Sequence, residues 1–319
     1  MAALRRSPRA RRLVQLGFGA AVIAGTIAIV GTGPLVRGVL AISPAAILAA
    51  VLLTGAATFA AAWRWRTVSA ELGLPMRWTS AVAAYYRSQF VNSVLPGGVI
   101  GDVHRAYRQG REARDVPIAA RAVITERAAG QVVQFVMTAA ILLALGMTGP
   151  LTGWLGAIAW VAVAVGAVVV IALVVALATV RGRGMLRHEL GALHSIFGSP
   201  RASIAIVASS VVVVASHTAT FIVACLAVGI EASPRELIGL ATIALAAASL
   251  PLNIGGWGPR EAVSASAFAV IGLGAGAGLA ASTAFGILTI IAVLPGAVFM
   301  IVDRVALATV RPRPEERTA

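Results

Sequence analysis

The sequence Gly258-Pro259-Arg260-Glu261 has the residue types of a helix start that could hold an anion. Glycine suits the cap position, proline the first helical position, and an acidic side chain the first turn. Inside a membrane, the unpaired N–H groups and the positive end of the helix dipole favour a negative group such as phosphate. Arg260 adds a fork of donors that matches phosphate geometry. The alternative is that Arg260 reaches the outer membrane interface and pairs with Glu261. The same candidate site includes Asn253, Gly255, Gly256 and Trp257.

A second set of polar residues flanks the motif Leu95-Pro96-Gly97-Gly98. Arg87 and Asn92 precede this motif, and Asp102 follows it. Asp102 and Arg105 are three residues apart and can pair on one helix face. An ionisable side chain within an apolar segment is a functional candidate by default, because burying it in a membrane is costly. The alternative for Arg87 is that it reaches the cytoplasmic interface beside two tyrosines.

Glu126 and Arg127 form a third candidate, about three turns into a helix that we expect to start near Asp115-Val116-Pro117. Glu126, Gly130 and Gln134 share one helix face, and such a polar stripe should face protein or a cavity rather than lipid. We expect Glu126 to pair with Arg87, to carry a proton in coupled transport, or to form a structural salt bridge.

The composition places these residues in a membrane protein. The 319 residues are 59% hydrophobic and only 12% charged, with a mean hydropathy of +0.91, whereas soluble domains carry about 25% charged residues. All 26 basic residues are arginine, and the net charge of +14 suits anionic lipid headgroups better than nucleic acid. The single cysteine, Cys225, excludes an internal disulfide and a cysteine metal cluster. We expect no metal, no cofactor and no catalytic residue.

Runs without charge predict about six full transmembrane helices, since about 20 apolar residues cross a bilayer. Two further stretches are interrupted by proline and glycine, which break helices, and we interpret them as re-entrant hairpins. The alternative is eight transmembrane helices. The runs are Leu13 to Val36, Gly38 to Trp63, Ala128 to Val180 (two spans), Ala202 to Ile230 and Leu279 to Val302, and the interrupted stretches are Arg77 to Gly101 and Leu237 to Ile271.

Arginine placement predicts the orientation, because cytoplasmic loops collect positive charge. The predicted topology puts all but three of the 26 arginines on the cytoplasmic side; the exceptions are Arg37, Arg235 and Arg260. We therefore expect a multi-pass protein of the cell membrane with cytoplasmic termini. Its parts would be a basic N-terminus (1–12), one membrane domain (13–303) and a basic tail (304–319). The N-terminal apolar run is too long for a signal peptide and is interpreted as an anchor.

The motif Leu-Pro, Gly-Gly, Gly and a carboxylate occurs twice, at Leu95 to Asp102 and at Leu250 to Glu261. The two copies lie nearly half the chain apart, and each half shows two spans, one broken hairpin and one span. Three full spans per half would turn the second half upside down, which is a recurring transporter architecture. We predict two inverted repeats, at about 13–148 and 151–303. The alternative is chance recurrence in a glycine-rich chain.

Other polar and aromatic residues receive structural interpretations. Trp63 and Trp65, beside Arg64 and Arg66, are expected to anchor the interface. His217 is expected to bond to a neighbouring helix rather than bind a ligand. The remaining basic residues, His104, Arg105, Arg108, Arg111 and Arg114, are expected to form a solvated stretch that contacts lipid headgroups.

The two proline and glycine motifs carry a family resemblance. Ser88 to Asp102, Glu126-Arg127 and Leu250 to Glu261 resemble the transmembrane region of lysylphosphatidylglycerol synthase, which defines a family of flippase-like membrane proteins. The resemblance implies a lipid-translocating role. It does not imply the synthase reaction, which in the family belongs to a separate soluble domain that we do not expect here.

The leading hypothesis is a lipid flippase or secondary transporter that moves an anionic lipid, or a lipid-linked headgroup, between leaflets. The alternative is a non-transport membrane partner of glycosyltransferases or lipid-synthesis enzymes. The sequence contains no ATP-binding motif, so directional transport would use lipid gradients, protons or the membrane potential. The oligomeric state, the lipid and the direction do not follow from the sequence.

Overall fold

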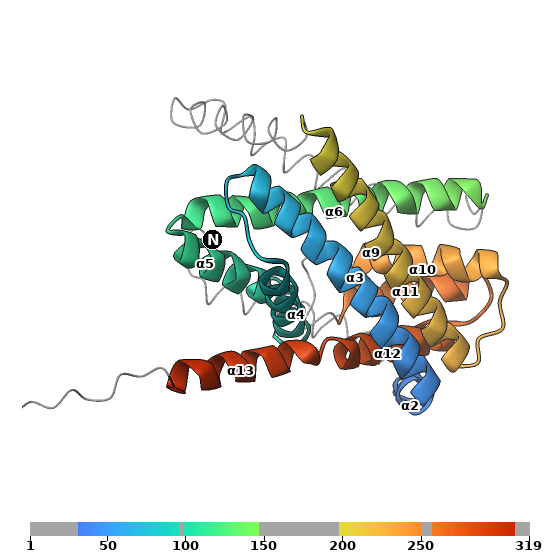
Figure 1. Ribbon diagram of the computed structural model, residues 1–319. Helices are drawn as coiled ribbons and strands as arrows, with labels where there is room; N and C mark the ends of the chain where they lie inside the picture. The colour runs from blue at the N-terminus through green and yellow to red at the C-terminus, as the bar shows by residue number, and fades with distance from the viewer. Residues whose placement is uncertain (1–30, 96–97, 147–197, 250–256, 310–319) are drawn as a thin grey trace, which may run out of the picture.

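The protein is described by a computed structural model that covers residues 31–95, 98–146, 198–249 and 257–309, with side chains as far as Asp303. In these ranges the chain folds into α-helices that cross one another at varied angles (Figure 1). Within the described residues, four helical segments are long and apolar enough to cross a membrane. They are α3 (Pro44–Glu71), α6 (Val116–Ala144), α9 (Pro200–Ala227) and the segment Ala275–Asp303. The chain is therefore an all-α polytopic membrane protein.

The long helices begin directly after residues whose side chains cap the first turn. The Ser43 and Ser199 hydroxyls accept hydrogen bonds from the first turns of α3 and α9, and each serine precedes a proline. Asp115 caps α6 in the same way, which confirms the predicted start of that helix. Each cap satisfies one of the N–H groups that the first turn of a helix leaves unpaired. The proline lies where no N–H is needed.

Both proline and glycine motifs break the chain into pairs of shorter helices, as predicted. The first pair is α4 (Trp78–Val94) and α5 (Ile100–Ala113), and the second is α10 (Pro234–Ala248) and α11 (Pro259–Val270). The helices of each pair pack against each other. Gly101 permits the close approach of α5 to α4, because a Cβ atom there would lie 2.1 Å from the Ser88 carbonyl oxygen.

The order and packing of the helices repeat in the two halves. Helices α3, α4, α5 and α6 have 28, 17, 14 and 29 residues, and α9, α10, α11 and α12 (Ala275–Ala292) have 28, 15, 12 and 18. Successive helices pack together in each series, α3 packs along α9, and the contact of α3 with α12 is matched by that of α9 with α6. Exchanging the two halves maps the α3–α12 contact onto the α9–α6 contact and the α3–α9 contact onto itself. Two repeats would show this correspondence, and their inverted orientation stays a prediction.

Several predicted helix ends were wrong. Helix α2 (Gly33–Leu40) includes Arg37, which the sequence placed in a loop. Helix α3 continues beyond Trp63 to Glu71. The sequence ended the span at Trp63 because Arg64 is charged, but Arg64 forms an ion pair with a buried carboxylate, Glu126, and is accommodated inside the helix bundle. The last predicted span, Leu279 to Val302, lies within the segment Ala275–Asp303, which is long and apolar enough to cross a membrane. The chain turns before Pro295, so this segment consists of α12 and α13 (Pro295–Thr309). The predicted anchor and the predicted spans between residues 147 and 197 lie outside the described residues.

Candidate functional site

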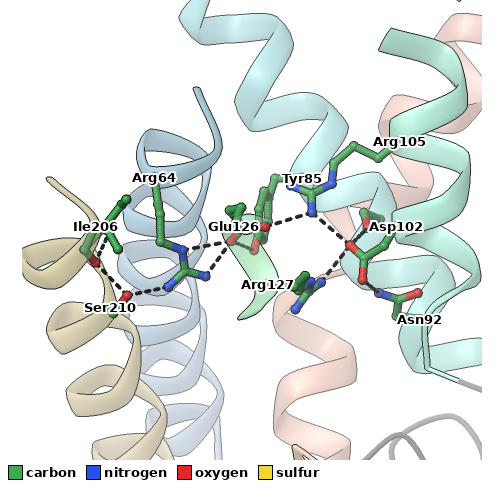
Figure 2. Close-up of polar contacts among 11 residues, drawn as sticks. Arg64, Tyr85, Asn92, Asp102, Arg105, Glu126, Arg127, Ile206 and Ser210 are labelled. Atoms are coloured by element: carbon green, nitrogen blue, oxygen red, sulfur yellow. Dashed lines mark hydrogen bonds and ion pairs between the residues drawn. The ribbon is translucent and has the colours of Figure 1, made fainter. Parts of the chain in front are cut away.

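Glu126 is the most enclosed charged residue of the central helices. Its side chain is 0% exposed, and its Oε1 accepts hydrogen bonds from Arg64 Nε at 2.9 Å and Nη2 at 2.5 Å. The Tyr85 hydroxyl also donates to Oε1, at 3.1 Å, and Arg105 Nη2 donates to Oε2 at 3.1 Å. Figure 2 shows these side chains converging from α3, α4, α5 and α6. The pairing compensates a charge that would otherwise be very costly to bury.

Asp102 is the second carboxylate of this network. Its Oδ1 accepts hydrogen bonds from Arg105 Nη2 at 3.0 Å, Arg127 Nη2 at 2.8 Å and the Ser88 hydroxyl at 2.9 Å. Asn92 Nδ2 donates to Oδ2 at 3.2 Å, and Asn92 Oδ1 accepts from the Gly101 N–H at 2.7 Å. These bonds tie the first turn of α5 to α4 across the chain break (Figure 2). The predicted pairing of Asp102 with Arg105 is confirmed.

Arg105 lies inside the protein and not on a solvated surface, so that prediction was wrong. It is 2% exposed, and its guanidinium carbon lies 4.4 Å from the ring centroids of both Trp65 and Tyr85. Cation–π contacts with two rings, together with two carboxylates, offset the loss of hydration. Trp65 is buried as well, so it is not the predicted interfacial anchor, whereas Trp63 is exposed.

Arg64 is the member of the network that sequence reasoning missed. Gly130 makes room for it, since a Cβ atom at that position would lie 2.8 Å from Arg64 Nη1. Arg64 Nη1 also donates to the Ser210 hydroxyl of α9 at 2.7 Å. The predicted stripe of Glu126 and Gly130 does face protein, and both residues meet Arg64. The sequence could have indicated this role, because Arg64 lies within a long apolar helix, where a charged side chain needs a partner.

The network carries more positive than negative charge. Arg64, Arg105 and Arg127 face only the carboxylates of Asp102 and Glu126. The excess lies with Arg127, because it has one ion pair among the described residues while its side chain is 41% exposed. Its Nε has no hydrogen-bond partner there either. Arg127 therefore keeps donors available for an anion.

Arg127 opens onto a polar cavity of about 270 Å³ between the two halves. Asn92 and Gly98 contribute from the first chain break, and His217 and Thr289 contribute from α9 and α12. The Nδ1 atom of His217 has no hydrogen-bond partner in the described part of the chain. The predicted helix–helix hydrogen bond of His217 is therefore not seen at this atom, and its ring packs edge-on against Phe285. The remaining lining residues are Thr54, Gln89, Ser93, Ala248 and Val293.

Arg87 does not pair with Glu126, which corrects one of the three expectations for that carboxylate. Arg87 Nη1 instead donates to Asp303 Oδ2 at 2.7 Å, and Arg108 Nη1 donates to the same oxygen. The residue is buried and does not reach an interface. Asp303 lies on α13, far along the sequence, and nothing in the sequence connected it with Arg87. Glu126 pairs with Arg64 and Arg105 instead.

Arg260 and Glu261 lie at the start of α11, as the cap pattern predicted. The Gly258 N–H donates to Glu261 Oε2 at 2.6 Å. Arg260 Nη2 donates to Glu261 Oε1 at 2.5 Å, and Arg260 Nε donates to Ser282 Oγ on α12 at 2.9 Å. The Arg260 guanidinium also lies 5.7 Å from the Trp257 ring centroid. The pair is buried, so Arg260 does not reach an interface, and its Nε and Nη2 atoms donate within the protein. Phosphate binding at Arg260 stays a prediction. The predicted site residues Gly97, Asn253, Gly255 and Gly256 lie outside the described residues.

The described residues contain no group of three or more histidine, cysteine, aspartate or glutamate side chains that could hold a metal ion. Arginines dominate the network, and Arg127 is the charged residue that lines the cavity. A guanidinium has donors but no lone pair to offer a metal. The chemistry of this site is therefore that of holding an anion through charge-assisted hydrogen bonds.

The chain matches a known protein family. The family described as "Lysylphosphatidylglycerol synthase TM region" matches residues 12–296. No curated protein and no solved structure matches the chain.

Proposed function

Because the chain belongs to the lysylphosphatidylglycerol synthase TM region family, we propose that it moves an anionic lipid, or a lipid-linked headgroup, between the leaflets of the membrane. Family membership itself indicates a lipid-related function in the membrane. The observation that carries the finer proposal is Arg127, whose exposed guanidinium lines a polar cavity between the two halves. The phosphate of the lipid would bind there.

The surroundings of Arg127 favour binding that is reversible. Asp102 holds one edge of its guanidinium at 2.8 Å, which fixes its direction, while 41% of the side chain stays exposed. A cation without a partner would bind an anion too strongly to release it, and a fully paired cation would not bind it. An arginine that shares a carboxylate with Arg105 lies between these limits. Transport requires such intermediate affinity, as ion conduction does.

The position of the cavity also supports movement between leaflets. Residues of both halves line it, including Gly98 from one chain break and Ala248 from the end of the helix before the other. In transporters built from two repeats, substrates bind between the repeats near broken helices, and rocking of one repeat against the other exposes the site alternately. The cavity accommodates a headgroup, and the acyl chains would remain in the bilayer.

The same proposal covers orientation and partners. The arginine distribution supports cytoplasmic termini in the cell membrane, and the positive excess at Arg127 supports anionic lipids as partners. We propose no chemical reaction: purified protein supplied with aminoacyl-tRNA and phosphatidylglycerol should form no aminoacylated lipid.

Lipid movement in vesicles tests the proposal. Purified protein is reconstituted with fluorescent phosphatidylglycerol or phosphatidylcholine, and the fraction of label that an added quencher reaches is followed over time. We expect the parent to move phosphatidylglycerol faster than phosphatidylcholine. We expect Arg127→Ala to slow this movement about ten- to hundredfold, since a charge-assisted hydrogen bond contributes about 1.5–3 kcal/mol.

Arg201→Ala is the matched control, because Arg201 is an exposed arginine in the first turn of α9 and does not line the cavity. Its rate should equal that of the parent, and Arg127→Lys should be intermediate. A folded Arg127→Ala protein that moves lipid at the parental rate would show that Arg127 does not bind the lipid. A parent that moves no lipid would refute transport and favour a role as a partner of lipid-synthesis enzymes.

A further inference from the structure

A second cavity of about 270 Å³ lies among α3, α4, α5 and α13, on the other side of the charged network from Arg127. Four basic side chains line it: Arg87, His104, Arg105 and Arg108. The cavity is separate from the one described above, because no residue lines both. Two carboxylates, Glu112 and Asp303, also line it, so basic side chains outnumber acidic ones.

Several hydrogen-bond donors of this lining have no acceptor in the part of the chain that the structure describes. The Nε and Nη1 atoms of Arg105 are buried without a partner, and so is the donor Nε2 of Gln109. The Gln109 Oε1 atom, an acceptor, is also without a partner there. Buried donors without partners cost free energy, so a site that retains them is completed by water or by a ligand. The missing component is an acceptor with several oxygen atoms.

One carboxylate of the protein occupies part of this cavity. Asp303 Oδ2 accepts hydrogen bonds from Arg87 Nη1 at 2.7 Å and from Arg108 Nη1. Asp303 is carried by α13, which packs on α4 through the rings of Phe299 and Tyr86. Its side chain is 30% exposed, so an anion can approach it. Two arginines that converge on one carboxylate oxygen form the kind of clamp that also binds phosphate.

We propose that this cavity is a phosphate-binding site and that Asp303 is its internal competitor. A carboxylate has two oxygens, whereas Arg87, Arg105, Arg108 and Gln109 together offer more donors than two oxygens can satisfy. A phosphate brings three or four oxygens and more negative charge. When phosphate binds, it replaces Asp303 on Arg87 and Arg108 and releases α13 from α4 and α5. The proposal concerns binding and does not require that the protein transports lipid.

The phosphate can come from a lipid headgroup or from a soluble phosphate, and the experiment distinguishes the two. Full-length protein with Cys225→Ala carries spin labels at Val103 of α5 and Ile301 of α13, both of which are exposed positions. It is placed in phosphatidylcholine nanodiscs. The distance between the labels is measured without ligand, with inorganic phosphate at constant ionic strength, and in nanodiscs that contain phosphatidylglycerol.

We expect the distance to lengthen with phosphate, with phosphatidylglycerol, or with both. A response to inorganic phosphate assigns the site to soluble phosphates, and a response to phosphatidylglycerol alone assigns it to a lipid headgroup. Asp303→Asn should show the longer distance without ligand. It should also bind its ligand about tenfold more tightly, as expected if the competitor occupies the site about nine-tenths of the time.

Glu71→Gln is the matched control. Glu71 is an exposed carboxylate at the end of α3, and it does not line the cavity. Removing its charge should leave the label distance unchanged and alter binding less than twofold. The proposal is overturned if neither ligand changes the distance, or if Asp303→Asn binds no more tightly than Glu71→Gln.

Discussion

Arg105 and Arg127 donate to the same atom, Asp102 Oδ1, from distances of 3.0 and 2.8 Å. Arg105 lines one polar cavity, and Arg127 lines the other. A single carboxylate oxygen therefore joins two arginines that serve two different sites. Both arginines compete for the same acceptor, so the hydrogen bonding of each depends on that of the other.

The first prediction concerns the buried carboxylate at the centre of the network. Glu126→Gln should lower the free energy of unfolding by about 3–5 kcal/mol, because it removes one partner of a buried pair and leaves Arg64 uncompensated. Thermal unfolding in detergent, followed by intrinsic fluorescence, measures the effect. Glu112→Gln removes a carboxylate from an exposed pair and should cost less than about 1 kcal/mol. Equal losses in the two variants would show that the network does not stabilise the fold.

The second prediction concerns the buried pair at the start of α11. Arg260→Ala should destabilise the protein strongly, because Glu261 and Ser282 lose their shared partner. Arg260→Ala combined with Glu261→Gln should recover part of that loss, since no unpaired carboxylate remains. The measurement is the unfolding temperature of both variants. If the Arg260→Ala protein is as stable as the parent but no longer moves lipid, Arg260 contributes to lipid binding and not to stability.

The third prediction uses two glycines that lie within helices. Gly101→Ala should cost at least about 1–3 kcal/mol, because its Cβ would lie 2.1 Å from a backbone carbonyl oxygen of α4, which cannot move like a flexible side chain. Gly55→Ala is the control, since its Cβ would lie an ordinary 3.6 Å from the Tyr86 hydroxyl. That change should be neutral or stabilising, because alanine favours helices. If both variants unfold at the parental temperature, the close packing of α4 and α5 is not required.

The fourth prediction concerns orientation. Single cysteines at Glu112 and Glu231, both exposed, are introduced into the protein with Cys225→Ala. A membrane-impermeant thiol reagent should label position 112 only from the cytoplasm and position 231 only from outside, because the arginine-rich ends of the helices remain cytoplasmic. Labelling of both positions from the same side would contradict the predicted topology.

The sequence determined by itself the features that depend on short stretches of chain. Apolar length identified the spans, and proline and glycine located both breaks, because these residues act on the backbone of their own segment. The caps at Asp115 and Gly258 could be predicted as well, because a cap depends only on residues of the same short segment. The helix order of the two halves followed from the repeated motif and the matching spans.

Only the tertiary structure decided which charges meet. Arg87 and Glu126 were a reasonable pair, but the rotation of each helix, which the sequence does not specify, turns Arg87 toward Asp303 and Glu126 toward Arg64. The sequence predicted Arg105 at the surface, because its neighbours in sequence are basic. In the structure, packing encloses it between two aromatic rings. Ion pairs form between residues that are distant in sequence, so their partners depend on how helices pack. Packing depends on the whole chain, including a glycine such as Gly130 that leaves space for an arginine.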